Sequence, residues 1–244
     1  LMFFTSSGKV YRIKAYFVPE ADRTARGRAI VNLLQLAPGE RVTAVIPIKE
    51  NDDNDGCLVM ATRDGLIKKT ALTEFESIRK VGKIAIILRE GDQLIAVSKI
   101  HEGDEIMLAS AKGKCIRFAE SDVRAMGRTS SGVRSIKMDM AVIEKGTTKD
   151  VLTVTELGYG KRCSLDEYRL QSRAGKGTKA GKFSDATGSI VNLKLVDPDD
   201  DVMLIANTGI IIRMPVNEIS RISKATKGVR IMRMRDDGRV VCAA

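Results

Sequence analysis

Five copies of one pattern run through the 244 residues of this chain. Glycines in turn-like contexts recur at spacings of 57, 48, 45 and 51 residues, and a short apolar run such as CLVMAT or VMLIAN precedes each one. These glycines are Gly8, Gly65, Gly113, Gly158 and Gly209. β-rich repeats of about 40 to 50 residues are typical of propellers built from four-stranded blades. The pattern therefore predicts an all-β fold in which each blade buries its apolar faces against its neighbours.

Other features keep fixed distances from these glycines. An acidic residue lies nine positions after four of them, and a second glycine follows after 17 to 19 residues, at Gly27, Gly82, Gly132, Gly177 and Gly228. A basic residue lies four positions after every turn glycine, at Arg12, Lys69, Arg117, Arg162 and Arg213. The register predicts a single domain, 1–244, with blade repeats at approximately 1–48, 57–100, 105–143, 151–196 and 202–244.

The composition excludes several classes of protein. Lysine and arginine outnumber aspartate and glutamate by 41 to 31, and this surplus favours a polyanionic partner such as nucleic acid. No apolar run approaches the length of a membrane span, so no membrane partner is expected. A single histidine, His101, offers little to a histidine-dependent hydrolase or a metal site. The four cysteines lie far apart and are expected to be reduced core residues of a cytoplasmic protein.

Positive charge gathers in glycine- and serine-rich loops around the second glycine of each repeat. Bases lie four residues before that glycine in four repeats, and two and five residues after it in the last three. Such a recurrence would form a basic ring that follows the phosphate backbone of duplex DNA. The predicted DNA-binding residues, expected in surface loops with few acids beside them, are Arg23, Arg26, Arg28, Arg128, Arg134, Lys137, Arg173, Lys176, Lys179, Lys182, Lys224, Lys227, Arg230 and Arg233.

The bases four positions after the turn glycines have two interpretations. They could contact DNA, or they could form a recurring structural ion pair with the acids at the ninth position, which are Glu74, Asp122, Glu167 and Glu218. Aromatic residues make up only 4% of the chain and tryptophan is absent, so stacking platforms for single strands are sparse. Contact with the duplex backbone, without reading of bases, is the expected mode.

Several strings resemble the family of C-terminal domains from the A subunit of bacterial DNA gyrase. They are ARGRAIVNLL at 25–34, KKTALTEF at 68–75, VRAMGRTSSGVR at 123–134 and LGYGKR at 157–162. The resemblance implies a β-pinwheel of six blades in which adjacent blades exchange strands. It implies a non-catalytic domain that wraps duplex DNA for a cytoplasmic, ATP-dependent type II topoisomerase. The implied partners are the rest of the A subunit, together with the B subunit, in an A2B2 assembly, with ATP and Mg²⁺ bound elsewhere than in this domain.

One family motif is degenerate in this chain. The family carries a Gln-Arg-Arg-Gly-Gly-Lys-Gly box that is needed for wrapping, and the nearest match here is QSRAGKG in the fourth repeat. The retained positions are Gln171, Arg173, Gly175, Lys176 and Gly177, whereas Ser172 and Ala174 depart from the box. The resemblance therefore places an intact box, with one further blade, upstream of Leu1. The related C subunit of topoisomerase IV, which needs no intact box, is an alternative.

Two other classes of function are alternatives to DNA binding. A propeller can serve as a platform for protein partners, because one fold hosts many functions. A propeller enzyme would need paired carboxylates or a nucleophile beside a base, and no such arrangement recurs among the repeats. The sequence thus predicts no catalytic residue, no metal ligand and no cofactor in this domain.

Overall fold

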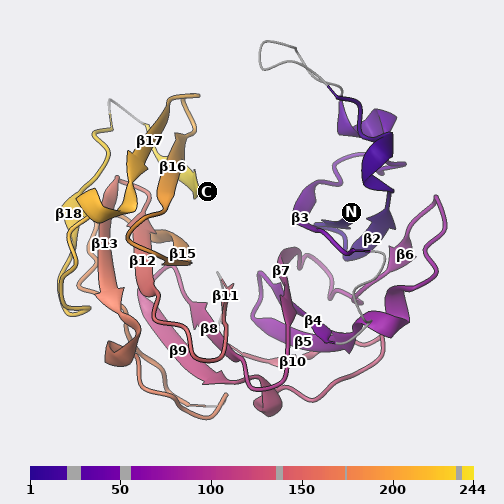
Figure 1. Ribbon diagram of the computed structural model, residues 1–244, viewed down its shortest axis with the longest axis horizontal. Helices are drawn as coiled ribbons and strands as arrows, with labels where there is room; N and C mark the ends of the chain where they lie inside the picture. Colours follow the sequence, from indigo (N-terminus) through magenta and orange to yellow (C-terminus); the bar gives the residue numbers. More distant parts are fainter. Residues whose placement is uncertain (21–28, 50–55, 136–139, 174, 235–237) are drawn as a thin grey trace. The chain divides into compact units, whose positions relative to one another are not determined.

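The computed structural model describes residues 1–20, 29–49, 56–135, 140–173, 175–234 and 238–244. Strands and short 3₁₀ turns are the regular elements of these segments, which confirms the predicted all-β class. The chain forms two compact units (Figure 1). Leu1–Glu102 and Val123–Arg134 make up the first unit, and Gly103–Asp122 and Ser135–Ala244 make up the second.

Each repeat begins with an antiparallel hairpin whose turn contains the predicted glycine. All five turn glycines have positive φ, between 77° and 84°, a conformation that glycine adopts without a steric penalty. The hairpins are β1 (Met2–Thr5) with β2 (Lys9–Arg12), β4 (Cys57–Thr62) with β5 (Leu66–Ala71), β8 (Glu105–Ala109) with β9 (Lys114–Ala119), β12 (Asp150–Thr155) with β13 (Tyr159–Ser164), and β16 (Asp201–Ala206) with β17 (Ile211–Pro215).

A third strand, from the end of the same repeat, pairs with the first strand of each hairpin. These strands are β3 (Val42–Ile46), β7 (Leu94–Ile100), β11 (Met140–Ile143), β15 (Ile190–Val196) and β19 (Val240–Ala243). The register shifts at the same place in four of the pairs, near the end of the first strand, as at Ala61/Thr62 and Val154/Thr155. The repeats of the sequence are therefore repeats of one strand arrangement.

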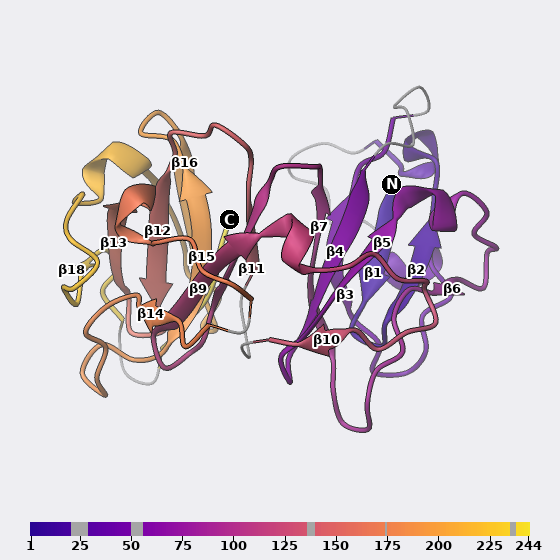
Figure 2. The same cartoon turned by 90° about the horizontal axis from the view of Figure 1, so that it is seen from below.

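The fourth strand of a sheet comes from the following repeat. The exchanged strands are β6 (Lys83–Ile84) on β2, β10 (Val133–Arg134) on β5, β14 (Thr178–Lys179) on β9, and β18 (Val229–Arg230) on β13. Figures 1 and 2 both show β18 beside β13. The fifth sheet has three strands, β17-β16-β19, in the part of the chain that the structure describes. Exchange between adjacent repeats is the pinwheel feature that the family resemblance implied.

A short 3₁₀ turn follows the second strand of each hairpin, and in the last four repeats it leads to the segment that ends in the exchanged strand. These turns are η1 (Ala15–Phe17), η3 (Leu72–Phe75), η4 (Glu120–Asp122), η5 (Leu165–Glu167) and η6 (Val216–Glu218), with η2 (Ile30–Asn32) later in the first repeat. We call the segment from turn to exchanged strand an arm: residues 76–84 in the second repeat, 124–134 in the third, 169–179 without residue 174 in the fourth, and 220–230 in the fifth.

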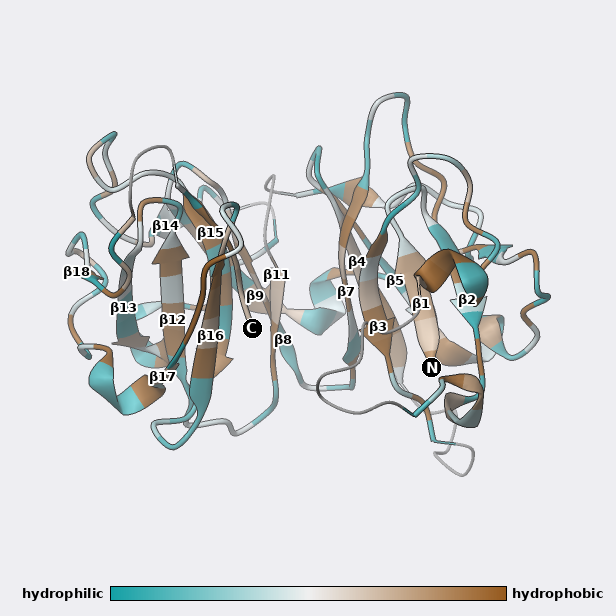
Figure 3. Ribbon diagram, turned by 90° about the horizontal axis from the view of Figure 1, so that it is seen from above, coloured by the Kyte–Doolittle hydropathy of each residue, from teal (hydrophilic) through white to brown (hydrophobic). Residues whose placement is uncertain are grey.

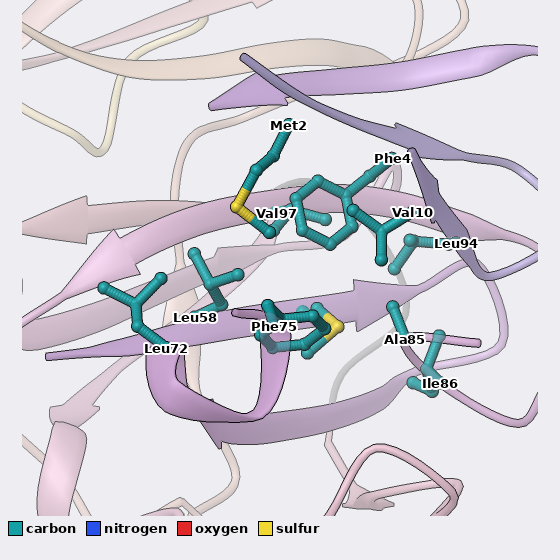
Figure 4. Close-up of a cluster of buried hydrophobic side chains, with 11 residues drawn as sticks. Met2, Phe4, Val10, Leu58, Leu72, Phe75, Ala85, Ile86, Leu94 and Val97 are labelled. Carbon is teal, nitrogen blue, oxygen red and sulfur yellow. The ribbon is translucent and has the colours of Figure 1, made fainter. Parts of the chain in front are cut away.

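Apolar side chains of adjacent repeats form common cores. In the first unit, Phe4 of β1 and Phe75 of η3 meet edge to face with ring centroids 6.2 Å apart, and Leu58 of β4 joins them (Figure 4). In the second unit, Met107 of β8 packs in one cluster with Tyr168, which follows η5. Most central strands are apolar, whereas β13 is largely hydrophilic (Figure 3). Burial between repeats thus supplies the stacking that single blades need.

Candidate nucleic-acid interface

Three of the bases four positions after the turn glycines form ion pairs with the strand beside them. Arg162 Nη1 lies 3.6 Å from Asp150 Oδ2, and Arg213 Nε donates to Asp201 Oδ2 over 3.0 Å. Arg117 forms the equivalent ion pair with Glu105. Each acid starts the first strand of the hairpin and lies diagonally across from the base, twelve residues earlier in sequence. The acid that pairs with the base in these three repeats is therefore this one and not the expected acid at the ninth position. In the third and fourth repeats the ninth-position acids, Asp122 and Glu167, accept instead from the arm of the following repeat.

Two of these bases also contact the next repeat. Arg117 Nη1 donates to the carbonyl oxygens of Leu165 and Tyr168, at 3.1 and 3.0 Å. Arg162 Nε donates to Ile219 O over 2.8 Å. Both sets of carbonyls belong to the 3₁₀ turn of the following repeat or the residue after it. The guanidinium groups of Arg117 and Arg162 therefore connect adjacent repeats, a structural role, although with other partners than the ninth-position acids that the sequence suggested.

The first repeat makes the same kind of contact. Arg12 Nη1 donates to Glu76 O over 2.9 Å, at the start of the second-repeat arm. Lys69, the equivalent residue in the second repeat, forms a bridge through its backbone with Ala125 of the third-repeat arm, and its carbonyl accepts from Met126 N at 2.9 Å. The arm of each following repeat is thus attached at this position in both units.

The bases four residues before the second glycine are held by acids of the preceding repeat. Arg128 Nε lies 3.5 Å from Glu74 Oε2. Arg173 donates from its backbone N to Asp122 Oδ2 over 3.0 Å. This finding corrects the expectation that few acids lie beside these loops: acids at the ninth position, remote in sequence, face them across the repeat boundary.

The fifth-repeat arm is held in the same way. Lys224 N donates to Glu167 Oε2 over 2.9 Å, and the Lys224 ammonium donates to the Glu167 carbonyl. Lys224 is also half-buried, as are Arg128 and Arg173, rather than projecting from a surface loop. These three bases are therefore attached at the boundaries between repeats, with part of each side chain accessible.

The bases after the second glycine face solvent. Arg134, Lys179 and Arg230 end the exchanged strands β10, β14 and β18, which are the outer strands of their sheets. The exposed bases on or beside these strands are Arg134, Lys176, Lys179, Lys182, Lys227, Arg230 and Arg233. Because the strands are exchanged, the exposed bases of one repeat lie at the edge of the sheet formed by the preceding repeat. The predicted residues Arg23, Arg26, Arg28 and Lys137 lie outside the described residues.

The degenerate box forms a tight turn on the edge of β9. Gln171 N donates to Arg117 O over 2.8 Å, and Gly175 N donates to Ser172 O over 2.8 Å. A Cβ atom at Gly175 would lie 3.0 Å from both Gln171 Oε1 and Ser172 O, so the turn has little room for a larger residue. Lys176 follows this turn and is exposed, and Gly177 has φ of +69°.

Two buried lysines, Lys68 and Lys161, were not among the site residues predicted from sequence. Each lies three positions after a turn glycine, where Tyr11, Ile116 and Ile212 occupy the other repeats. Lys68 and Lys161 are 0% and 1% exposed. Burial lowers the pKa of both ammonium groups, for Lys68 to about 8. One sequence signal could have identified them: a lysine stands at a repeat position that is apolar or aromatic in the other three repeats.

Other classes of site find no support in the described residues. Within that part of the chain, no cluster of three or more histidine, cysteine or acidic side chains has the arrangement of a metal site. None of the helices there is long and apolar enough to cross a membrane. Cys57, Cys115, Cys163 and Cys242 are all free thiols.

Comparison with known proteins gives the same architecture. The model of the family described as DNA gyrase C-terminal domain, beta-propeller, matches residues 1–49, 58–101, 104–139, 149–197 and 200–241. The A subunit of DNA gyrase from Salmonella typhimurium is 45% identical over 247 residues, covering 99% of this chain, and that from Staphylococcus epidermidis is 39% identical, covering 97%. The chain spans 28% and 27% of the lengths of these two relatives.

Solved structures extend the match to three dimensions. A DNA gyrase A C-terminal domain superposes with a TM-score of 0.82 at 25% identity, covering 99% of this chain and 80% of that one. A C-terminal domain of DNA topoisomerase IV superposes with a TM-score of 0.87 at 22% identity, covering 100% of this chain and 77% of that one, which shows the shared fold. By its five matched segments and these relatives, the chain belongs to the DNA gyrase C-terminal domain family.

Proposed function

We propose that this chain is the part of a DNA gyrase A subunit that binds duplex DNA and wraps it, without reading its sequence. The observation that carries the proposal is the repeated placement of exposed bases on exchanged strands, at Arg134, Lys179 and Arg230. Membership of the gyrase family supplies the context. Because these bases recur at equivalent positions of successive sheets, a phosphate backbone could meet the same contact in each repeat.

The chemistry of the exposed residues supports contact with phosphates rather than with bases. Lysine and arginine side chains neutralise phosphate groups and release counterions, and such contacts carry no sequence information. Lysine and arginine are the most numerous exposed residues of the arms, and serine, threonine and some apolar residues lie between them. Affinity should therefore depend strongly on salt and little on the sequence of the duplex.

Wrapping needs many such contacts, because bending a duplex by about 90° over a short path costs on the order of several kcal/mol. One base per repeat would not offset that cost. Contacts distributed over several arms would offset it, because each neutralised phosphate adds to the electrostatic free energy of binding. The proposal therefore requires several arms to contact one DNA molecule at the same time.

The whole protein would then have the assembly and activity of its relatives. We propose the rest of the A subunit, together with the B subunit, as partners in an A2B2 heterotetramer that introduces negative supercoils with ATP in the cytoplasm. Catalytic residues, ATP and Mg²⁺ would lie in those other parts, and this domain would contribute DNA geometry and no chemical step. The proposal predicts that the isolated chain, without ATP and without cutting DNA itself, shifts the linking number of nicked circles that a ligase seals in its presence.

Binding of the 244-residue chain to linear duplexes, across a salt series, tests the proposal. If about six to ten phosphates are neutralised, log K should fall with log salt at a slope of about −5 to −9. Duplexes of unrelated sequence and equal length should give the same slope and affinity. A flat salt dependence would contradict the proposal and favour a platform for protein partners instead.

A further inference from the structure

Lys68 and Lys161 occupy the same place in two different sheets and make the same unusual contacts. Each ammonium group is buried at the third position after a turn glycine, in β5 and in β13. A buried charge is costly unless hydrogen bonds satisfy it. In both cases the groups that satisfy it include backbone carbonyls in the arm of the following repeat.

Lys68 satisfies all three of its N–H donors on carbonyl oxygens. Its Nζ donates to Ala85 O at 2.7 Å, to Arg128 O at 2.6 Å and to Ser130 O at 3.3 Å. Ala85 follows the exchanged strand β6, whereas Arg128 and Ser130 belong to the third-repeat arm. One ammonium group therefore fixes two backbone positions of that arm.

Lys161 repeats this arrangement in the other compact unit. Its Nζ donates to Lys224 O and, over 2.8 Å, to Thr226 O in the fifth-repeat arm. These carbonyls lie four and two residues before the second glycine, as Arg128 O and Ser130 O do. The ring of Phe183 covers the ammonium group, with the ring centroid 5.7 Å from Nζ.

The third- and fifth-repeat arms have the same local conformation where these lysines bind them. Ser130 Oγ donates to Gly127 O, and Thr226 Oγ1 donates to Ser223 O, both over 2.9 Å. The second glycine of each arm then packs on the strand below it: a Cβ atom at Gly132 would lie 2.5 Å from Ile67 O. Arg134 and Arg230 follow two residues later, both exposed.

We propose that Lys68 and Lys161 are positioning residues for DNA binding: each fixes the backbone of one arm so that the exposed bases beyond it meet the phosphates. The inference rests on the proposed function above. Neither lysine can reach a DNA molecule itself, because both are buried. Their effect arises because a fixed arm loses less conformational freedom when it binds. The fourth-repeat arm has Ile116 at the equivalent position and lacks this anchor.

Double-mutant cycles on the 244-residue chain test this inference. Lys68→Met and Lys161→Met remove the two ammonium groups, and Arg134→Ala and Arg230→Ala remove one exposed base from each arm. Lys145→Met, which changes an exposed lysine outside the arms, is the matched control. Affinity for one linear duplex is measured at several salt concentrations for every single and double variant.

The expected result is coupling within an arm and none between arms. Loss of one phosphate contact should weaken binding about three- to tenfold and reduce the salt slope by about 1. Arg134→Ala should weaken binding by that amount both as a single substitution and in the Lys161→Met background. In the Lys68→Met background the same substitution should weaken binding less than about twofold. Arg230→Ala should show the reverse dependence. Equal losses in every background would overturn the inference.

Two further results separate this inference from its alternatives. Lys68→Gln and Lys161→Gln keep two N–H donors without the charge, and they should recover affinity to within about twofold of the unchanged chain. If both the methionine and the glutamine variants lose cooperative unfolding, the lysines serve the whole fold and the inference is wrong. If the unchanged chain shows no salt-dependent binding, the proposed function fails first, and this inference with it.

Discussion

The fourth- and fifth-repeat arms rest on equivalent strands but are held by different chemistry. The fifth-repeat arm lies on β13, where the buried cations Lys161 and Arg162 donate to its carbonyls or to those of the turn before it. The fourth-repeat arm lies on β9, where Ile116 replaces the lysine and Arg117 is only partly buried. The same arrangement of strand and arm therefore forms with either a buried lysine or an isoleucine beneath the arm.

Burial of the arginine and its acid also differs between the two arms. The side chains of Arg162 and Asp150 are 9% and 7% exposed, whereas those of Arg117 and Glu105 are 17% and 21% exposed. Asp150 also accepts from Arg221 Nε, at 3.0 and 2.9 Å, so one carboxylate holds a base of its own repeat and a base of the next arm. Breaking this group should therefore affect the fifth-repeat arm most.

Replacing Arg162 should give the largest loss of stability. Arg162→Met leaves the Ile219 carbonyl unpaired and Asp150 with Arg221 as an exposed partner, and breaking a buried pair typically costs about 3–5 kcal/mol. Arg117→Met should cost less, about 1–2 kcal/mol, because that pair is more exposed. Denaturant unfolding of both variants measures the comparison, and equal losses would show that burial is not the deciding factor.

Replacing the buried lysine should have an intermediate effect. Lys161→Met removes the ammonium donor from the carbonyls of Lys224 and Thr226, and this should lower the free energy of unfolding by about 1–3 kcal/mol. Part of this loss should be offset because the substitution also removes a buried charge. Ile116→Met at the equivalent position should cost less than about 1.5 kcal/mol, because it conserves volume and leaves no polar group unpaired. A larger loss at Ile116 would contradict the distinction between polar and apolar support.

Lys68, the buried lysine of the first unit, should make the free energy of unfolding depend on pH. Burial lowers the pKa of Lys68 to about 8, aided by Arg128 and opposed by Glu74, whereas an unfolded lysine titrates near about 10.4. Below about pH 8 both states hold the proton, and between about 8 and 10.4 only the unfolded state does, so the free energy of unfolding should rise with pH. Relative to Lys68→Met, the chain should gain stability between about pH 7 and about pH 9.5, and a constant difference would contradict the shift.

Charge reversal on the exposed strands should change stability least. Lys179→Glu with Lys182→Glu, or Arg230→Glu with Arg233→Glu, should alter the free energy of unfolding by less than about 1 kcal/mol, because these side chains are exposed. Each pair should nevertheless weaken duplex binding and reduce the salt slope by about 2. Unchanged binding in both double variants would remove the fourth- and fifth-repeat arms from the interface.

The sequence predicted the elements well because its register is set by local chemistry. Positive φ at Gly8 and its four equivalents fixes each hairpin turn, and the short apolar run before each glycine marks the strand that leads into it. Residue patterns alone did not show that β10 leaves its own repeat to pair with β5. That exchange came from the family resemblance, because a two-residue strand carries too little pattern of its own.

The site was predicted less completely, because its pairings cross repeat boundaries. Glu74 and Arg128 are 54 positions apart in the chain and meet only because an arm folds back onto the preceding repeat. Lys68 resembles any surface lysine in the run IKKT, and its burial depends on carbonyls of the third-repeat arm. Exposed bases such as Arg134 and Arg230 were identified by sequence position, and their contact with DNA stays a prediction.

A topology assay tests the central claim most directly. Nicked circular DNA is incubated with the 244-residue chain, sealed with ligase, deproteinised and separated by gel electrophoresis, alongside a variant in which Lys179, Lys182, Arg230 and Arg233 are all changed to glutamate. Wrapping predicts a shift in linking number that grows with the amount of the unchanged chain and is smaller or absent for the variant. Tight, salt-dependent binding with no shift in linking number would contradict the claim that this chain wraps DNA.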